Sequence, residues 1–243
     1  MSYYNTLMSW KKNRLKKLLP PPVKAEHSEY SLILSACDQP AIMTKQLLQL
    51  GLKAIEYAAD VNLGEIGTRN EQAKIYSNLW PGEHYRLLAG LMLALKPKLV
   101  LELGTSTGLS ALCLKQYLPP GGKVVTFDIV PWRQYPATLF KENDFDGRLI
   151  QYVDDLSIES KMHEYAELIR DAELIFIDVA HDGDLEERIL SNLKKIDFRN
   201  KVFVLLDDIR VWTMIKMWRE ISLPKMDLTS FGHWSGTGLI ELK

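Results

Sequence analysis

Five short apolar segments in the second half of the chain alternate with helical patterns, and this alternation restricts the fold more than any other feature. The segments are rich in Val, Ile, Leu and Phe without polar alternation, which is typical of strands buried on both faces. Such strands, each followed by a helix, predict a parallel sheet covered by helices on both sides. They are KLVLELG (98–104), KVVTFDI (123–129), RLIQYVDD (148–155), AELIFIDVA (172–180) and KVFVLLDD (201–208).

The two ends of the chain differ from this pattern. Residues 226–243 contain two strand-like runs around Gly, Ser and Thr, which predicts an antiparallel hairpin. The residues before Lys98 carry mostly helical signals. We therefore predict an α/β fold, a doubly wound, mostly parallel seven-stranded sheet with an antiparallel C-terminal hairpin and an N-terminal helical extension. We expect the extension to span residues 1–80 and a Rossmann-like domain to span residues 81–243.

The composition restricts which molecules the protein is expected to bind and in which cellular compartment it is expected to lie. The formal net charge of −1 argues against a broad nucleic-acid-binding face. The two cysteines have no metal or redox spacing, and no segment resembles a signal peptide or a membrane span, so a cytoplasmic location is expected. The basic segment SWKKNRLKKLL (9–19) predicts a helix that packs against its own domain or a subunit, with an anionic membrane or an acidic partner as the alternative.

Acidic residues stand at or near the carboxyl end of every predicted parallel strand. In doubly wound sheets, ligands bind beyond the carboxyl ends of the strands. The acids are therefore expected to face one crevice rather than scattered surface. They are Glu102, Asp128, Asp154 with Asp155, Asp178, and Asp207 with Asp208.

The segment LELGTSTGLSAL (101–112) predicts a strand, a glycine-containing turn and a helix start. Gly104 and Gly108 allow a ligand to approach the backbone closely. Ser106 stands where a dinucleotide fingerprint has its second glycine, which weakens a nicotinamide interpretation without excluding it. Asp128 ends the second strand about 20 residues further on, where an acid can accept both hydroxyls of a ribose.

These residues resemble class I methyltransferases that use S-adenosylmethionine, whose first motif has the form E-x-G-x-x-T-G-x-S. The resemblance covers residues 82–243 and implies that the glycine turn holds the methionine part of the cofactor. It implies that Asp128 binds the ribose and Asp155 the adenine amino group, with Asp154 as the alternative register. The residues expected to bind the cofactor are Glu102, Gly104, Thr105, Thr107, Gly108, Ser110, Asp128 and Asp155.

Three of the acids are expected to crowd one corner of the crevice. Asp178 ends the fourth strand, and Asp207 and Asp208 end the fifth. Carboxylates so close repel one another, and a hard divalent cation such as Mg²⁺ or Mn²⁺ would relieve the repulsion. FIDVAHDGDLEERILSNL (176–193) and LLDDIRVWTMIKMW (205–218) resemble segments of metal-dependent O-methyltransferases. The resemblance implies that the three aspartates bind the metal, with His181 as the general base.

The resemblance implies a divalent-metal-assisted O-methyltransferase that acts on a hydroxyl of a small molecule, such as a sugar, a natural product or a phenolic. Ala180 and Gly183 depart from the pattern on the acceptor side. The N-terminal helices would cover the acceptor or build a homodimer, and neither a nucleic-acid partner nor stable membrane insertion is expected. The alternatives are a nicotinamide-dependent oxidoreductase and a nucleic-acid-directed or non-catalytic methyltransferase relative.

Other polar residues receive simpler interpretations. Three further histidines are expected to be surface or hydrogen-bonded structural residues. Three acids after His181 are expected to lie in solvent at the start of a helix, where their negative charge interacts favourably with the helix dipole. Arg69, Asn70 and Trp212 are candidates to reach the acceptor. The histidines are His84, His163 and His233, and the acids are Asp184, Glu186 and Glu187.

Overall fold

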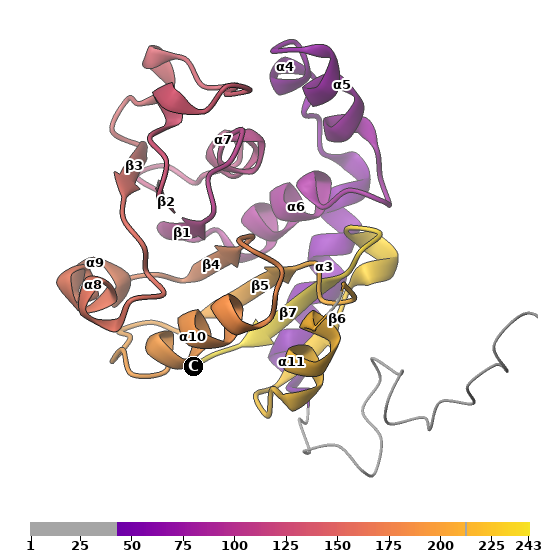
Figure 1. Ribbon diagram of the computed structural model, residues 1–243. Coiled ribbons are helices and arrows are strands. Elements are labelled where there is room, and N and C mark those ends of the chain that lie inside the picture. Colours follow the sequence, from indigo (N-terminus) through magenta and orange to yellow (C-terminus); the bar gives the residue numbers. More distant parts are fainter. Residues whose placement is uncertain (1–42, 212) are drawn as a thin grey trace, which may run out of the picture. The chain divides into compact units, whose positions relative to one another are not determined.

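The computed structural model describes residues 43–211 and 213–243, and a seven-stranded sheet lies at its centre (Figure 1). The strands are β1 (Leu99–Leu103), β2 (Lys123–Asp128), β3 (Leu149–Val153), β4 (Leu174–Ile177), β5 (Phe203–Asp207), β6 (Lys225–Asp227) and β7 (Thr237–Glu241). Their order in space is β3-β2-β1-β4-β5-β7-β6. Strands β1 to β5 are parallel, while β7 is antiparallel to β5 and β6. The predicted sheet is confirmed.

Helices cover both faces of this sheet (Figure 1). One face carries α3 (Lys45–Asp60), α4 (Gly64–Gly67), α5 (Glu71–Asn78), α6 (Tyr85–Leu95) and α7 (Leu109–Gln116). The other carries α8 (Glu159–Glu164), α9 (Ala166–Ile169), α10 (Asp184–Leu193) and α11 (Met214–Glu220). Short 3₁₀ helices are η1 (Trp132–Gln134), η2 (Glu142–Asp144) and η3 (Thr229–Phe231).

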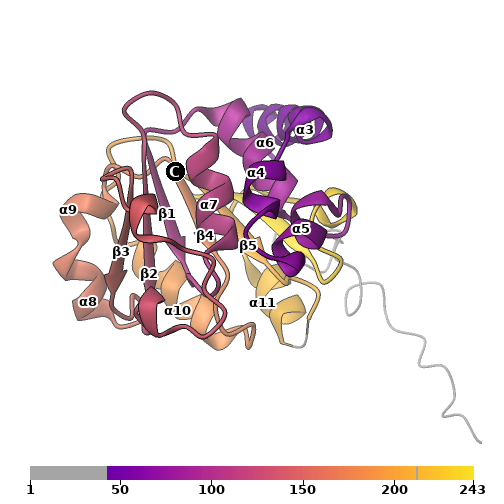
Figure 2. The same cartoon turned by 90° about the horizontal axis from the view of Figure 1, so that it is seen from above.

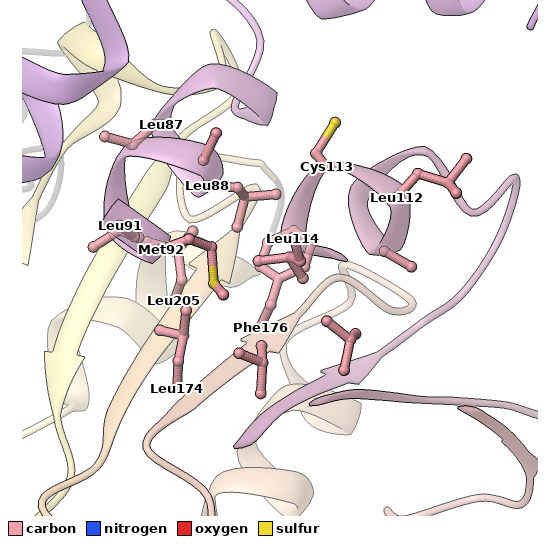
Figure 3. Packing of buried hydrophobic residues seen from close by; sticks show 14 of the residues in the cluster. Leu87, Leu88, Leu91, Met92, Leu112, Cys113, Leu114, Leu174, Phe176 and Leu205 are labelled. Carbon is pink, nitrogen blue, oxygen red and sulfur yellow. The ribbon is translucent and has the colours of Figure 1, made fainter. Parts of the chain in front are cut away.

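The strands are apolar on both sides because each side packs under a helical layer. In β5, Phe203 and Leu205 belong to the core under α3 to α7, whereas Val204 and Leu206 belong to the core under α8 to α11. Figure 3 shows side chains of α6 and α7 packed over Phe176 of β4 and neighbouring strand residues. This two-sided burial explains why the segments lack polar alternation.

Helices α3 and α6 pack closely on one face of the sheet (Figure 2). At their crossing, a β-carbon on Gly90 would overlap the carbonyl oxygen of Ala54, so only glycine permits this approach. Helix α3 therefore shares a core with α6 and the strands. The domain boundary at residue 80 stays a prediction. The basic segment 9–19 and Trp212 lie outside the described residues.

The C-terminal pair does more than extend the sheet, because β7 inserts between β5 and β6. The loop before β7 then reaches the carboxyl end of β5. There the N–H of Gly82 donates to the carbonyl of Gly232 (3.0 Å), and the N–H of Trp234 donates to the carbonyl of Gly82 (3.1 Å). These bonds join the segment before α6 to the segment before β7. Within the described residues, no helix has the length and apolar character needed to cross a membrane.

Candidate functional site

A cavity of about 330 Å³ opens at the carboxyl ends of β1, β2, β3 and β4. The strand order reverses between β1 and β4, which is where doubly wound sheets bind ligands. Four residues expected at the site line this cavity: Gly104, Asp128, Asp155 and Asp178. Polar lining residues outside that expected set are Ser106, Tyr135 and Asp154, and the apolar ones include Phe127, Ile129, Leu156 and Ile189.

The glycine turn is held by the carboxylate that ends β2. Asp128 accepts hydrogen bonds from the backbone N–H groups of Thr105 (2.8 Å), Ser106 (3.0 Å) and Val130 (2.9 Å). Each carboxylate oxygen can accept more than one hydrogen bond, so the group can still accept ribose hydroxyls. Asp128 therefore shapes the turn and lines the cavity. Gly104 has φ of +97°, a region open to glycine and rare for other residues.

Five of the expected cofactor residues support the turn without lining the cavity. Glu102 is fully buried on the α7 side of the sheet, and burial raises the pKa of its carboxyl to about 8, although hydroxyls of Ser110 and Thr126 oppose the rise. The hydroxyls of Thr105 and Thr126 lie 2.7 Å apart. The five residues are Glu102, Thr105, Thr107, Gly108 and Ser110. Their contact with a cofactor stays a prediction.

Asp154 and Asp155 both line the far end of the cavity. Asp154 accepts a hydrogen bond from the Tyr165 hydroxyl (2.8 Å) and lies 3.5 Å from the ammonium of Lys161. Asp155 accepts from the backbone N–H of Ser157 (2.9 Å). Side chains engage Asp154 and a backbone N–H engages Asp155, and which of the two contacts a cofactor stays a prediction.

His181 lies between two of the strand-end carboxylates. Its Nε2 is 2.8 Å from Oδ1 of Asp178, and its Nδ1 is 3.1 Å from Oδ2 of Asp208. The residue has φ of +58°, and its N–H donates to Glu186 (2.7 Å), which also accepts from the N–H of Gly183 (2.9 Å). The expectation that Glu186 is solvated was wrong, because this side chain is turned inward to hold the loop that carries His181.

Two more histidines surround Asp207, which is buried at the end of β5. Its Oδ2 lies 3.1 Å from Nδ1 of His233 and 3.2 Å from Nδ1 of His84. The contact with His84 is not aligned as a hydrogen bond, and Oδ1 of Asp207 has no hydrogen-bond partner. Nδ1 of His233 is also 3.2 Å from Asp208, whose carboxylate accepts a hydrogen bond from the Ser235 hydroxyl. His84 and His233 are thus part of the site, which their interpretation as isolated structural residues missed.

Imidazoles and carboxylates alternate through this cluster and shift one another's protonation. The hydrogen bond from His181 to Asp178 raises the pKa of His181 to about 9. Burial would lower the pKa of His233, but Asp207 and Asp208 outweigh it and raise the value to about 10. Burial would raise the pKa of Asp207, yet the histidines hold it well below its usual range. Protonated histidines therefore relieve the carboxylate repulsion from which a metal was predicted.

The other residues considered as candidates for the site lie outside the first cavity and the histidine–aspartate cluster. Arg69 forms a two-pronged ion pair with Asp144 (2.7 Å for each bond), and His163 is exposed on α8. Asn70 caps α5 by accepting from the N–H of Ala73 (2.6 Å), and it lines a second cavity of about 180 Å³. That cavity also includes Tyr76, Tyr85 and Ser106, so it shares Ser106 with the first cavity.

The chain is similar to known proteins in sequence and in fold. Residues 101–209 match a family model described as a methyltransferase domain. Over 179 residues the chain is 28% identical to the catechol O-methyltransferase domain-containing protein 1 of Mus musculus, covering 73% of this chain and 58% of that protein. The chain therefore spans little more than half the length of this curated relative.

Solved structures share the fold. A methyltransferase from Geobacter sulfurreducens has a TM-score of 0.52 at 18% identity, covering 75% of this chain and 92% of that chain. The O-methyltransferase TomG from Streptomyces achromogenes, involved in tomaymycin synthesis and solved in complex with SAM, has a TM-score of 0.50 at 16% identity. That match covers 82% of this chain and 99% of that chain.

Proposed function

Because the chain is a class I S-adenosylmethionine-dependent methyltransferase related to the catechol O-methyltransferases, we propose that it methylates a hydroxyl of a small molecule. The observation that carries the proposal is the position of His181 and Asp178 beside the cavity whose other end is lined by Asp128 and Asp155. A cofactor in this cavity would have its reactive end next to groups that can move a proton. This family assignment replaces the alternative of a nicotinamide-dependent oxidoreductase.

We assign each end of the cavity to a part of the cofactor. Asp128 would accept the ribose hydroxyls, and Asp155 would accept the adenine amino group. Gly104 contacts the backbone of Asp178 and lines the same cavity, which supports placing the methionine part and the methyl group there. Phe127 and Ile189 line the cavity with apolar surface suited to the flat adenine ring.

The second cavity is our candidate for the acceptor. It lies between α5, the start of α6 and the glycine turn, and Ser106 lines both this cavity and the first. Its polar lining, from Asn70, Tyr76 and Tyr85, fits a hydroxylated compound such as a sugar, a natural product or a phenolic. In this arrangement the N-terminal helices cover the acceptor. A homodimer built by these helices and a cytoplasmic location remain further proposals.

His181 is the proposed general base. Both of its ring nitrogens contact carboxylates and its pKa is about 9, so one nitrogen must lose its proton and leave its carboxylate before the ring can accept the acceptor's proton. Asp178 would then hold the ring in position and stabilise the imidazolium that forms. Glu186 fixes the backbone of the same loop, which limits how far His181 can move.

We also propose that Mg²⁺ or Mn²⁺ assists the reaction, held by Asp178, Asp207 and Asp208. The donor set is of the right kind, since hard divalent cations prefer carboxylate oxygens, and Oδ1 of Asp207 is buried without a hydrogen-bond partner. When bound, such an ion would lower the pKa of the acceptor hydroxyl and orient it. It would also take Asp178 or Asp208 away from His181, which would lower the pKa of His181 and allow a ring nitrogen to lose its proton and act as the base.

The test is transfer of a labelled methyl group from S-adenosylmethionine to a panel of sugars, phenolics and hydroxylated natural products. We expect at least one hydroxyl to be methylated and calorimetry to show binding of S-adenosylhomocysteine but not of NADH. Methylation of only nitrogen acceptors or of RNA, or binding of NADH alone, would overturn the proposal. Salt-dependent retention of RNA by the full chain would indicate the nucleic-acid-directed alternative.

A further inference from the structure

Three side chains at the deep end of the cluster bring metal-binding atoms together. His84 precedes α6, Asp207 ends β5, and His233 lies in the loop between η3 and β7. One ligand atom from each lies within 4.8 Å of the others. Among the described residues, this is the group of histidine, cysteine and acidic side chains whose donor atoms converge in this way.

Because these groups are buried, polar atoms among them that lack hydrogen-bond partners indicate a possible ligand. His84 and Asp207 are each 3% exposed, and His233 is partly buried. Neither ring nitrogen of His84 has a hydrogen-bond partner, and neither does Oδ1 of Asp207. Buried polar atoms without partners are uncommon and cost stability, so each points to a ligand that would satisfy it. These atoms belong to adjacent side chains that face one another.

We propose that His84, Asp207 and His233 bind a divalent transition-metal ion through two imidazole nitrogens and one carboxylate oxygen, and that the ion displaces the protons which the two rings otherwise carry on those nitrogens. Imidazole donors favour ions such as Zn²⁺, Co²⁺ or Ni²⁺, whereas Mg²⁺ prefers oxygen donors alone. Ligand atoms around tetrahedral Zn²⁺ are roughly 3.4 Å apart, given bonds of about 2.1 Å. The separations here, up to 4.8 Å, require only small rotations of the side chains.

A neighbouring carboxylate lies where it could orient one ligand. An oxygen of Glu83 is 3.7 Å from Nε2 of His233, whereas Nδ1 of the same ring faces Asp207. This separation is too long for a hydrogen bond, so Glu83 would have to approach Nε2 to fix the ring's orientation when the ion binds. The Ser235 hydroxyl lies 2.8 Å from Nδ1, the nitrogen that would bind the ion, and would then keep only its bond to Asp208. Glu83 and Ser235 are both buried.

The site goes beyond the proposed function and does not depend on it. It shares Asp207 with the three carboxylates proposed to hold Mg²⁺, but it includes neither Asp178 nor Asp208. A transition ion bound here would engage Asp207 and so alter the affinity of the carboxylate set for Mg²⁺. Variants at Asp178 and at the two histidines should therefore separate the two sites.

The experiment is a titration of the chelator-treated full chain with Co²⁺, followed by visible absorption, with calorimetry using Zn²⁺ as a second readout. We expect one equivalent to bind with a ligand-field band and to remain bound in excess Mg²⁺. His84→Gln and His233→Gln should each weaken Co²⁺ binding by at least about 10–100-fold, the effect of altering even an outer partner. His233 is the less buried, so its variant keeps the test open if His84→Gln does not fold.

Two variants serve as controls. His163→Ala, on the exposed face of α8, and Asp178→Asn should both keep the cobalt band. Absence of the band in the wild-type chain, or its persistence in His233→Gln, would overturn the site. Loss of the band in Asp178→Asn would also overturn it, by placing the ion among the carboxylates. Methyl transfer is not read in this experiment, so an inactive protein would not affect the outcome.

Discussion

Gly104 and the backbone carbonyl of Asp178 lie in such close contact that any side chain at position 104 would overlap the carbonyl oxygen. Gly104 follows β1 and Asp178 follows β4, and the strand order reverses between these two strands. The contact therefore joins the turn proposed to hold the cofactor to the carboxylate proposed to act in chemistry. It fixes the distance between the two halves of the site through backbone atoms.

Gly104→Ala should damage both halves of the site. The added β-carbon would displace Asp178, and alanine would be strained at a φ of +97°. We expect weaker binding of S-adenosylhomocysteine, lower turnover and a loss of stability of about 1–3 kcal/mol. Gly147→Ala is a matched control, since Gly147 has φ of +86° but open space around its β-carbon position. Equal effects in calorimetry and thermal unfolding would show that backbone strain alone matters.

Asp128→Ala should weaken S-adenosylmethionine binding by about 1.5–3 kcal/mol, the scale of a hydrogen bond to a charged group. Part of this loss would come from the turn, because Asp128 also accepts from the N–H groups of Thr105 and Ser106. Asp128→Asn keeps one carbonyl acceptor for the turn and should lose less. Calorimetric affinity unchanged in a folded Asp128→Ala protein would remove the ribose assignment.

His181→Ala should lower turnover by about 10²–10⁴-fold while cofactor binding stays near wild type. Since the pKa of His181 is about 9, the ring is protonated at neutral pH, and turnover of the metal-restored enzyme should rise with pH toward that value. The pH-dependent rise should vanish in the variant and persist in His163→Ala. Because Asp178 is the main cause of the raised pKa, saturating Mg²⁺ should move the rise to lower pH. An unchanged pH profile in His181→Ala would assign the base elsewhere.

Chelation should abolish methyl transfer while S-adenosylhomocysteine still binds, since Gly104 and Asp128 need no metal. Mg²⁺ or Mn²⁺ should restore activity to the wild-type protein but not to Asp178→Asn. The measurement is turnover after EDTA treatment, beside calorimetry on the same sample. Full activity of the metal-free protein would contradict metal assistance and leave the imidazole–carboxylate cluster to act alone.

Glu102→Gln should change how stability depends on pH. Burial raises the folded-state pKa of Glu102 to about 8 from 4.5, so the folded protein keeps a proton that the unfolded chain loses above 4.5. The free energy of unfolding should then fall as pH rises from 4.5 toward 8, by on the order of 1.4 kcal/mol per unit. Glutamine removes this dependence. Denaturant unfolding of the wild-type protein and of Glu102→Gln from pH 5 to 9 would test this dependence, with Glu187→Gln, at an exposed position, as the control. The same change of unfolding free energy with pH in all three proteins would refute it.

Local sequence determined most of the fold. The five apolar segments form β1 to β5, and the segments with helical patterns between them form helices. Both outcomes follow from the pattern of polar and apolar residues within each segment. The acids at the strand ends converged for the same reason, since parallel strands bring their carboxyl ends to one edge. Gly104, Asp128, Asp155 and Asp178 accordingly line one cavity.

Tertiary structure alone decided what surrounds Asp207. His84 and His233 lie far apart in the chain and reach this carboxylate because β7 inserts between β5 and β6 and because Gly82 pairs with the loop before β7. No local pattern specifies that pairing. Glu186 likewise turns inward because Gly183 and His181 present N–H groups to it. A residue's own neighbours specify its strand or helix, but the partners of a buried charge come from whichever segments the packed sheet brings beside it.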